Sequence, residues 1–273
     1  TLPSEVAMNR KSDWLFRLYL YLFLAYLLLP LIVMGGAAFN DSRFPSVYPW
    51  AGFTWTWFVD LWNDTRLLNA FKNTLIVALA VVALSVPIGT AAAILINSLA
   101  GSARNALYGL MVAPILTPGA VIGISTLLFW NTLSVPAGLH LSVLGQVSYI
   151  AAFVMLLVLA RLQSFDRSFE EAALDLGASH AMVMRRILLP HLYPAIGAGA
   201  AIAFFQSIEN FNITLFTRGP YDTMTVYVFS KVRSGITPTI NALAVILIAA
   251  TLTGVLIVEM RRRYAAEDGK SGH

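Results

Sequence analysis

The chain alternates long apolar runs with short polar segments, and the apolar runs have the length that crosses a membrane. About 20 apolar residues suffice for a helix to span a bilayer. Six runs of this kind lie at approximately 15–37, 74–96, 107–130, 143–162, 195–216 and 240–258. The pattern therefore predicts an all-α polytopic membrane protein with six transmembrane helices.

Proline and glycine interrupt two of these runs. Pro87 and Gly89 lie in the second run, and Pro114 and Pro118 lie in the third. A proline inside a membrane helix frees backbone groups that neighbouring helices or cavity water must satisfy. The third run is therefore either a path-lining or mobile helix, or a kinked helix packed in the bundle. We take Pro114 and Pro118 as candidate residues of a substrate path.

The loop between the first and second runs is rich in tryptophan. It holds four of the six tryptophans in the chain. Tryptophan prefers the headgroup level of a bilayer, so we expect this loop to lie at the membrane interface. Part of it, from Trp55 to Phe71, has the composition of a short amphipathic helix.

A polar, charged stretch separates the fourth and fifth runs and predicts a helical hairpin. Ser168 and Glu171 have the spacing of a capping box, so a helix is expected to begin near Ser168. Gly177 can end that helix in a left-handed conformation that other residues resist. Ser179 can cap a second short helix, and Pro190 lies beyond its expected end.

The fifth run carries an ionisable residue, Glu209, somewhat past its middle. A charge at that depth costs about 2.5 kcal/mol or more, so such residues face a cavity or a partner. Gln206, Glu209 and Asn210 share one face of a helix by their spacing, and Asn212 adds polarity close by. The patch either lines the path of a cationic or polyhydroxyl solute, or glues helices together by hydrogen bonds, with Glu209 charged or protonated.

The composition and the absence of known motifs argue against catalytic, metal and nucleotide-binding sites in this chain. Hydrophobic residues make up 58% and charged residues 12% of the 273 residues, against about 25% charged in soluble domains. Cysteine is absent, the four histidines lack metal-ligand spacing, and neither a phosphate-binding P-loop nor a G-x-S-x-G nucleophile elbow occurs. We therefore expect no enzyme, no metal site and no cofactor in this chain. The net charge of +4 is small and does not indicate nucleic-acid binding.

Lysine and arginine set the expected orientation. Six spans place both termini on one side, and twelve Lys and Arg lie on that side, counting the hairpin, against six on the other. Because positive residues stay in the cytoplasm, the termini and the hairpin are expected there.

The domain boundaries follow from these segments. We predict a cytoplasmic segment 1–14, a six-span membrane domain 15–260 that includes the hairpin 166–190, and a cytoplasmic tail 261–273 that is disordered over 265–273. The first residue is Thr1, so we expect a processed or trimmed start, and the first apolar run is too long for a signal peptide.

The hairpin resembles the EAA signature of binding-protein-dependent ABC importer permeases. Glu171-Ala172-Ala173, then Gly177, then Ile187-Leu188-Leu189-Pro190 carry the resemblance. It implies a cytoplasmic hairpin that docks into a groove of an ATP-binding subunit, with small alanines for close approach, charges for pairing, and an apolar end that anchors it to the bundle. The implied coupling residues are Glu171, Ala172, Ala173, Asp175, Gly177, Arg185, Arg186, Ile187, Leu189 and Pro190.

The resemblance also implies partners that this chain does not contain. A second permease, either a copy or a related chain, completes the bundle, and two ATP-binding subunits carry the ATP and magnesium. A periplasmic or extracellular solute-binding protein delivers the cargo. The chain itself is expected to be a multi-pass protein of the bacterial cytoplasmic membrane, in contact with lipid.

The prediction of the substrate rests on one short stretch of the fifth run and the loop after it. Ser207 to Phe211, followed by Gly219-Pro220, is similar to the corresponding run of polyamine-type permeases, although Glu209 stands where Asp is commoner. A carboxylate with apolar walls suits putrescine or spermidine. Related branches carry ferric iron, thiamine, aminophosphonates or opines, and these stay open. A secondary transporter is the competing class, since it would need no hairpin and no ATP.

Overall fold

Every regular element in the part of the chain that the structure describes is a helix. This computed structural model describes residues 10–235 and 237–268. The chain divides into two compact units, residues 65–229 and residues 1–64 together with 230–273, each held together by its own packing. The prediction of an all-α membrane protein is confirmed.

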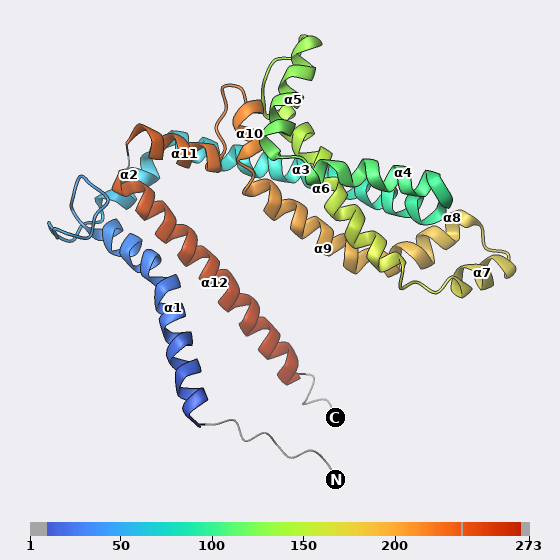
Figure 1. Ribbon diagram of the computed structural model, residues 1–273, viewed down its shortest axis with the longest axis horizontal. Helices are drawn as coiled ribbons and strands as arrows, with labels where there is room; N and C mark the ends of the chain where they lie inside the picture. The colour runs from blue at the N-terminus through green and yellow to red at the C-terminus, as the bar shows by residue number, and fades with distance from the viewer. Residues whose placement is uncertain (1–9, 236, 269–273) are drawn as a thin grey trace. The chain divides into compact units, whose positions relative to one another are not determined.

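Three long helices form the bundle of unit 65–229. They are α3 (Thr65–Ser98), α6 (Leu139–Leu162) and α9 (Leu189–Ile208), and they lie side by side (Figure 1). Their core consists of buried aliphatic side chains, chiefly Val77, Val81, Ile150, Val154, Val158 and Leu192. This bundle links the candidate site at one end to the hairpin at the other.

Helix α3 runs unbroken through the point where an interruption was predicted. Pro87 lies inside it. Membrane helices tolerate proline where neighbouring helices pack around the freed backbone groups, as α6 and α9 do here. Gly89 makes the close approach possible, because a Cβ at this position would lie 2.5 Å from the carbonyl oxygen of Ala151 in α6.

The third predicted span is not one helix. It consists of α4 (Gly101–Val112), a 3-10 turn η1 (Ala113–Leu116) and α5 (Gly119–Thr132), and the chain bends by 105° between η1 and α5. Thr117 has φ −91° and ψ 130°, which is the extended conformation that the residue before Pro118 favours. Pro118 therefore breaks this span into two helices, whereas the sequence predicted a single helix that was either mobile or kinked.

The fifth predicted span is also broken. Helix α9 ends at Ile208, and a second helix, α10 (Asn212–Thr217), follows after residues 209–211. The side chain of Asn210 accepts a hydrogen bond from the backbone nitrogen of Ile213 at 3.2 Å and so replaces a helical bond at the start of α10. Glu209 thus lies at the break, where a continuous helix was predicted.

The hairpin consists of α7 (Ser168–Asp175) and α8 (His180–Val183), and a π-helical turn η2 (Met184–Leu188) joins α8 to α9. The second helix was predicted to end before Pro190, but it continues through this residue. The backbone nitrogen of Leu189 bonds to the carbonyl oxygen five residues back, and this wide turn accommodates the proline ring, which has no N–H to contribute. His180–Ile208 is therefore one 29-residue helix.

The other unit contains α1 (Arg10–Phe39), α2 (Thr56–Asn63) and α12 (Pro238–Asp268), and α12 packs against both of the others. Helix α11 (Met224–Ser234) crosses the boundary between the units. The helix predicted from Trp55 to Phe71 is in fact two helices, α2 and the start of α3, which Asp64 separates in an extended conformation.

The loop between α1 and α2 is organised by a buried asparagine. The Asn40 side chain donates to the carbonyl oxygens of Ser46 and Pro49 and accepts from the nitrogen of Ala51. The indole of Trp57 donates to the Asn40 carbonyl oxygen at 2.9 Å. The tryptophan-rich loop is therefore a structured element.

The described residues support four or five membrane spans. Four helices are long and apolar enough, and the bent pair of α4–η1 with α5 makes a fifth. The sixth predicted span, 240–258, lies within α12, of which the apolar stretch Pro238–Gly254 taken alone is too short to be counted as a span. The count of six stays a prediction. Helix α12 extends to Asp268, so the start of the predicted tail is helical, and residues 1–9 and 269–273 lie outside the described part.

Candidate functional site

The first helix of the hairpin is capped by Asp166. Its carboxylate accepts a hydrogen bond from the backbone nitrogen of Ser168 at 2.9 Å. That bond lowers the pKa of Asp166 from its ordinary value, because it stabilises the charged form. The predicted start of the helix at Ser168 is confirmed, but the capping box is not formed, because Arg167 occupies the cap position without a side-chain bond.

The turn between α7 and α8 confirms the predictions for Gly177 and Ser179. Gly177 has φ +86°, in the left-handed region, and the nitrogen of Ala178 bonds to the carbonyl oxygen of Ala173 at 3.0 Å. This is the pattern of a Schellman motif. The Ser179 hydroxyl accepts from the nitrogen of Met182 at 3.3 Å and caps α8. The hairpin therefore has a fixed bend.

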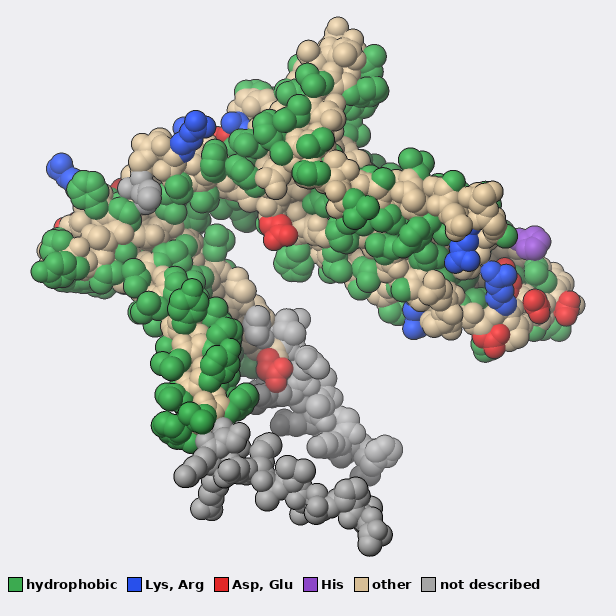
Figure 2. Space-filling model, viewed as in Figure 1, with side chains coloured by type: hydrophobic (Ala, Val, Ile, Leu, Met, Phe, Trp, Pro, Cys, Tyr) green, Lys and Arg blue, Asp and Glu red, His purple; other side chains and the backbone are tan. Residues whose placement is uncertain are grey.

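The candidate coupling residues lie largely on the surface of the hairpin, where Figure 2 shows charged side chains gathered over α7 and α8. The exposed ones are Glu171, Ala172, Asp175, Gly177, Arg185, Arg186 and Pro190, and the half-buried ones are Ala173, Ile187 and Leu189. The side chains that anchor the hairpin most deeply are Val183 and Leu188, which are 3% and 8% exposed. The anchor predicted at Ile187, Leu189 and Pro190 therefore lies at neighbouring positions.

Three large apolar side chains on the hairpin face outward. Phe169, Leu176 and Met182 are 61%, 89% and 44% exposed. Sequence reasoning did not single them out, although an apolar residue beside the helix-ending Gly177 is a visible signal. Asp175, Arg185 and Arg186 make no ion pair with any described residue. The hairpin thus presents both apolar and charged groups that have no partner within the described chain.

A cavity of about 320 Å³ lies at the other end of the bundle, and its volume is within the range of small-ligand pockets. Its walls come from the 3-10 turn η1, from α5, from α6 and from the break between α9 and α10. The lining residues are Pro114, Ile115, Thr117, Gly119, Ile122, Tyr149, Phe153, Gln206, Glu209, Asn210, Phe211, Asn212 and Ile213. The two broken spans therefore meet at one cavity.

This cavity brings together most of the candidate path residues. Gln206, Glu209 and Asn210 line it, as the helical spacing predicted, although the helix ends before Glu209. Pro114 and Asn212 line it as well. Pro118 lies between two lining residues without lining the cavity itself.

Glu209 is the acidic residue among those that line the cavity. The residue is exposed, and its carboxylate makes no ion pair or hydrogen bond with any described residue. Tyr149, Phe153 and Phe211 line the same cavity, and aromatic faces attract cations. The cavity is therefore suited to a small cation.

Asn210 uses its side chain within the protein. Its amide nitrogen donates to the Tyr149 hydroxyl at 2.9 Å, and its amide oxygen accepts from the nitrogen of Ile213. Its backbone carbonyl oxygen accepts from the hydroxyl of Thr225 in α11 at 3.3 Å. The geometry of Asn210 therefore favours hydrogen bonding between helices over contact with a solute.

Polar residues on α6 face the break, and sequence reasoning missed them. The Ser207 hydroxyl donates to the Gln146 amide oxygen at 2.6 Å, and the Gln146 amide nitrogen donates to the Thr214 hydroxyl at 2.9 Å. One turn earlier, Ser142 bonds to Thr217 at 2.9 Å. The signal was present in the spacing: Ser142, Gln146 and Tyr149 recur on one face of an otherwise apolar run.

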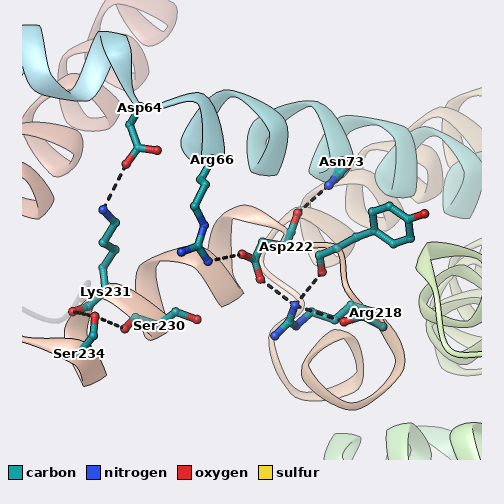
Figure 3. Close-up of polar contacts among 10 residues, drawn as sticks. Asp64, Arg66, Asn73, Arg218, Asp222, Ser230, Lys231 and Ser234 are labelled. Carbon is teal, nitrogen blue, oxygen red and sulfur yellow. Dashed lines mark hydrogen bonds and ion pairs between the residues drawn. The ribbon is translucent and has the colours of Figure 1, made fainter.

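An ion-pair cluster fixes the segment after α10 (Figure 3). Asp222 is bound by Arg218 at 2.7 Å and by Arg66 at 3.0 Å, and the side chain of Asn73 donates to its backbone oxygen at 2.9 Å. The segment from α10 to α11 is thereby tied to the first turns of α3. In the other unit, Lys231 pairs with Asp64 at 3.2 Å.

Comparisons with known proteins identify what the chain resembles. Residues 85–265 match the family described as binding-protein-dependent transport system inner membrane component. The putrescine transport system permease protein PotI of Escherichia coli K12 is 33% identical over 250 residues, which cover 88% of this chain and 87% of that protein.

A second relative and a solved structure agree with this match. The spermidine/putrescine transport system permease protein PotC of Haemophilus influenzae is 29% identical over 246 residues, covering 90% of this chain and 95% of that protein. A solved structure of a bacterial ABC transporter involved in the import of the acidic polysaccharide alginate superimposes with a TM-score of 0.73 at 21% identity. It covers 93% of this chain and 96% of that chain, and at this identity it supports the fold.

Proposed function

We propose a substrate and a coupling route for this chain, which belongs to the family of binding-protein-dependent transport system inner membrane components. The protein is the permease subunit of an ABC importer, a multi-pass inner-membrane protein, and ATP hydrolysis is carried out by a separate subunit. Within that frame, we propose that the solute is a polyamine, that Glu209 binds it, and that the hairpin around Gly177 couples it to ATP.

The observation that carries the substrate proposal is the unpaired carboxylate of Glu209 in the cavity. A polyamine is a flexible chain with ammonium groups separated by methylenes. Glu209 offers a counter-charge for one ammonium group, while Tyr149, Phe153 and Phe211 offer aromatic surface for the methylenes and for cation–π contact. The names of the relatives PotI and PotC agree with a solute of this chemistry.

The coupling proposal rests on the surface of the hairpin. Leu176 is 89% exposed, and the charged candidates Asp175, Arg185 and Arg186 have no ion-pair partner among the described residues. In this proposal the ATP-binding subunit covers the exposed leucine and pairs with the charges beside it. The hairpin is therefore proposed to fit a groove of the ATP-binding subunit, with Gly177 fixing its bend.

The helix that follows the hairpin supplies the mechanical link. His180–Ile208 is a continuous helix of 29 residues. At 1.5 Å per residue such a helix is about 43 Å long, so it reaches from the hairpin to the break at Glu209. A displacement of the hairpin when the ATP-binding subunits close would be transmitted along this helix to the cavity, as rigid elements do in two-state transitions.

The remaining partners follow from this arrangement. A second permease would complete the path, and a solute-binding protein would deliver the polyamine from the outside. The excess of Lys and Arg on the side of the hairpin and the termini supports a cytoplasmic location for them. The Asp222 cluster would then hold the segment between α10 and α11 in place on the outer side.

The test of the substrate proposal is Glu209→Gln in the assembled importer, reconstituted with its binding protein and labelled putrescine. Losing a charged hydrogen-bond partner is expected to raise the KM for putrescine by about 10- to 100-fold. Asp60→Asn removes an exposed carboxylate from α2, outside the cavity, and is the matched control. An unchanged KM in Glu209→Gln would remove Glu209 from the path. Uptake of thiamine, ferric iron, an aminophosphonate or an opine in place of putrescine would overturn the polyamine assignment.

A further inference from the structure

A buried glutamine joins the two halves of the broken fifth span. Gln146 of α6 is fully buried, and its amide bonds to Ser207 at the end of α9 and to Thr214 in α10. The residues between these two contacts, 209–211, line the cavity. One side chain therefore spans the break that presents Glu209.

The two ends of the amide have different roles. The oxygen accepts from the Ser207 hydroxyl at 2.6 Å, and the nitrogen donates to the Thr214 hydroxyl at 2.9 Å. Ser207 is 4% exposed and Thr214 is fully buried, so water does not compete for these bonds. Buried hydrogen bonds in a low dielectric are strong and geometrically restrictive. The distance between the end of α9 and the start of α10 is thereby set from outside the broken span.

Neighbouring residues of α6 extend the contact on both sides. Ser142 bonds to Thr217 near the end of α10, and Tyr149 accepts from Asn210 within the break. Gln146 is the central member of this stripe, and its side chain bonds to both α9 and α10, whereas among the described residues Ser142 bonds to α10 and Tyr149 to the break. Tyr149 also lines the cavity, whereas Gln146 does not.

We propose that Gln146 is a positioning residue, which holds the break between α9 and α10 in the geometry that presents Glu209 to the solute. It does not touch the solute itself. This proposal rests on the proposed function of Glu209. It implies that Gln146, which does not line the cavity, contributes indirectly to the affinity for the solute.

Gln146→Met separates this role from folding. Methionine is unbranched and close to glutamine in size, so the core stays filled. The Ser207 hydroxyl can turn to a carbonyl oxygen of the preceding turn of α9, and the Thr214 hydroxyl can turn to the carbonyl oxygen of Phe211 in the break. The variant is therefore expected to assemble, while the tie between α9 and α10 is lost. Ser148→Ala is the matched control, because the Ser148 hydroxyl bonds within its own helix, to the carbonyl oxygen of Gly145.

Two measurements test the proposal in the assembled importer. In the first, Gln146→Met raises the KM for putrescine at least about threefold, the scale expected for losing a buried hydrogen bond, and leaves the ATPase rate without solute unchanged. In the second, Phe211→Cys places a single thiol in the break of a chain that has no cysteine of its own. The rate at which a cationic thiol reagent labels this chain changes at least about threefold when Gln146→Met is added, because a looser break alters access.

The outcomes separate this proposal from the function on which it rests. If Glu209→Gln raises the KM while Gln146→Met alters neither the KM nor the labelling rate, the positioning role is overturned and the polyamine site stands. If Gln146→Met changes the labelling rate while Glu209→Gln leaves uptake unaltered, the break is held as proposed and the substrate assignment fails. Equal effects of Gln146→Met and Ser148→Ala would also overturn the positioning role.

Discussion

The bend at Gly177 offers a sharp test of the coupling route, because its cost can be worked from the backbone. Gly177 has φ +86°, and a Cβ added there would meet nothing within 4 Å. The cost of Gly177→Ala is therefore conformational alone, about 1–2 kcal/mol for an L-residue in the left-handed region. That cost lowers the population of the native turn by a factor of about 5–30 relative to alternative turns.

Two further substitutions at this position bracket the effect. Gly177→Asn is expected to cost less than alanine, since asparagine tolerates the left-handed conformation. Gly177→Pro is expected to abolish the turn, because proline cannot reach a positive φ and loses the bond from the nitrogen of Gly177 to the carbonyl oxygen of Leu174 at 2.9 Å. The order of coupling should follow Gly, Asn, Ala and Pro.

The assay is the amount of putrescine taken up per ATP hydrolysed in proteoliposomes that hold the complete importer. Gly197→Ala is the matched control, since Gly197 lies inside α9 and a Cβ there also meets nothing within 4 Å. It is expected to leave the ratio unchanged, because alanine suits a helix better than glycine does. A wild-type ratio in inserted Gly177→Pro would refute the role of the bend.

Two other predictions concern the same hairpin. Leu176→Ala should weaken binding of the ATP-binding subunit by about 10-fold or more, since burying a leucine contributes about 1.5–3 kcal/mol, and equal binding in a pull-down titration would exclude Leu176 from the interface. Folding lowers the pKa of Asp166, because its carboxylate accepts the bond from Ser168. The bond therefore stabilises α7 fully at pH values above the pKa that Asp166 has in the unfolded chain. This stabilisation is lost as the pH falls through the lower pKa of Asp166 in the folded protein. The protection factors of the α7 amides, which remove the intrinsic pH dependence of hydrogen exchange, should therefore fall in acid and stay constant between pH 6 and 8. Asp166→Asn should abolish that acid dependence, whereas a change in protection between pH 6 and 8 that the variant shares would contradict it.

The hairpin could be predicted in most of its parts because its signals are local. Gly177 and Ser179 act within a few residues of their own positions, so the sequence indicates both the bend and the cap. The prediction placed the first cap at Ser168 because it relied on the capping-box spacing and did not consider Asp166. It also ended α8 before Pro190, because a π-helical turn that accommodates a proline has no simple sequence pattern.

The cavity was predicted only in part, because one of the two breaks that line it is bridged by residues distant in the sequence. Pro118 gave a local signal for the break in the third span, but not its angle of 105°. The break at Glu209 is bridged by Gln146, which lies 61 residues from Ser207 and 68 from Thr214 along the chain. Hydrophobic periodicity cannot reveal such a pairing, and it therefore predicted one continuous helix from 195 to 216.

Transport by this permease is proposed to use work received from another subunit. The direct measurement is uptake of labelled putrescine by proteoliposomes that contain the permeases, with the binding protein outside, compared with and without the ATP-binding subunits and ATP. We expect uptake in the complete system and none when the ATP-binding subunits are left out. Sustained uptake against a gradient by the permeases alone would contradict it.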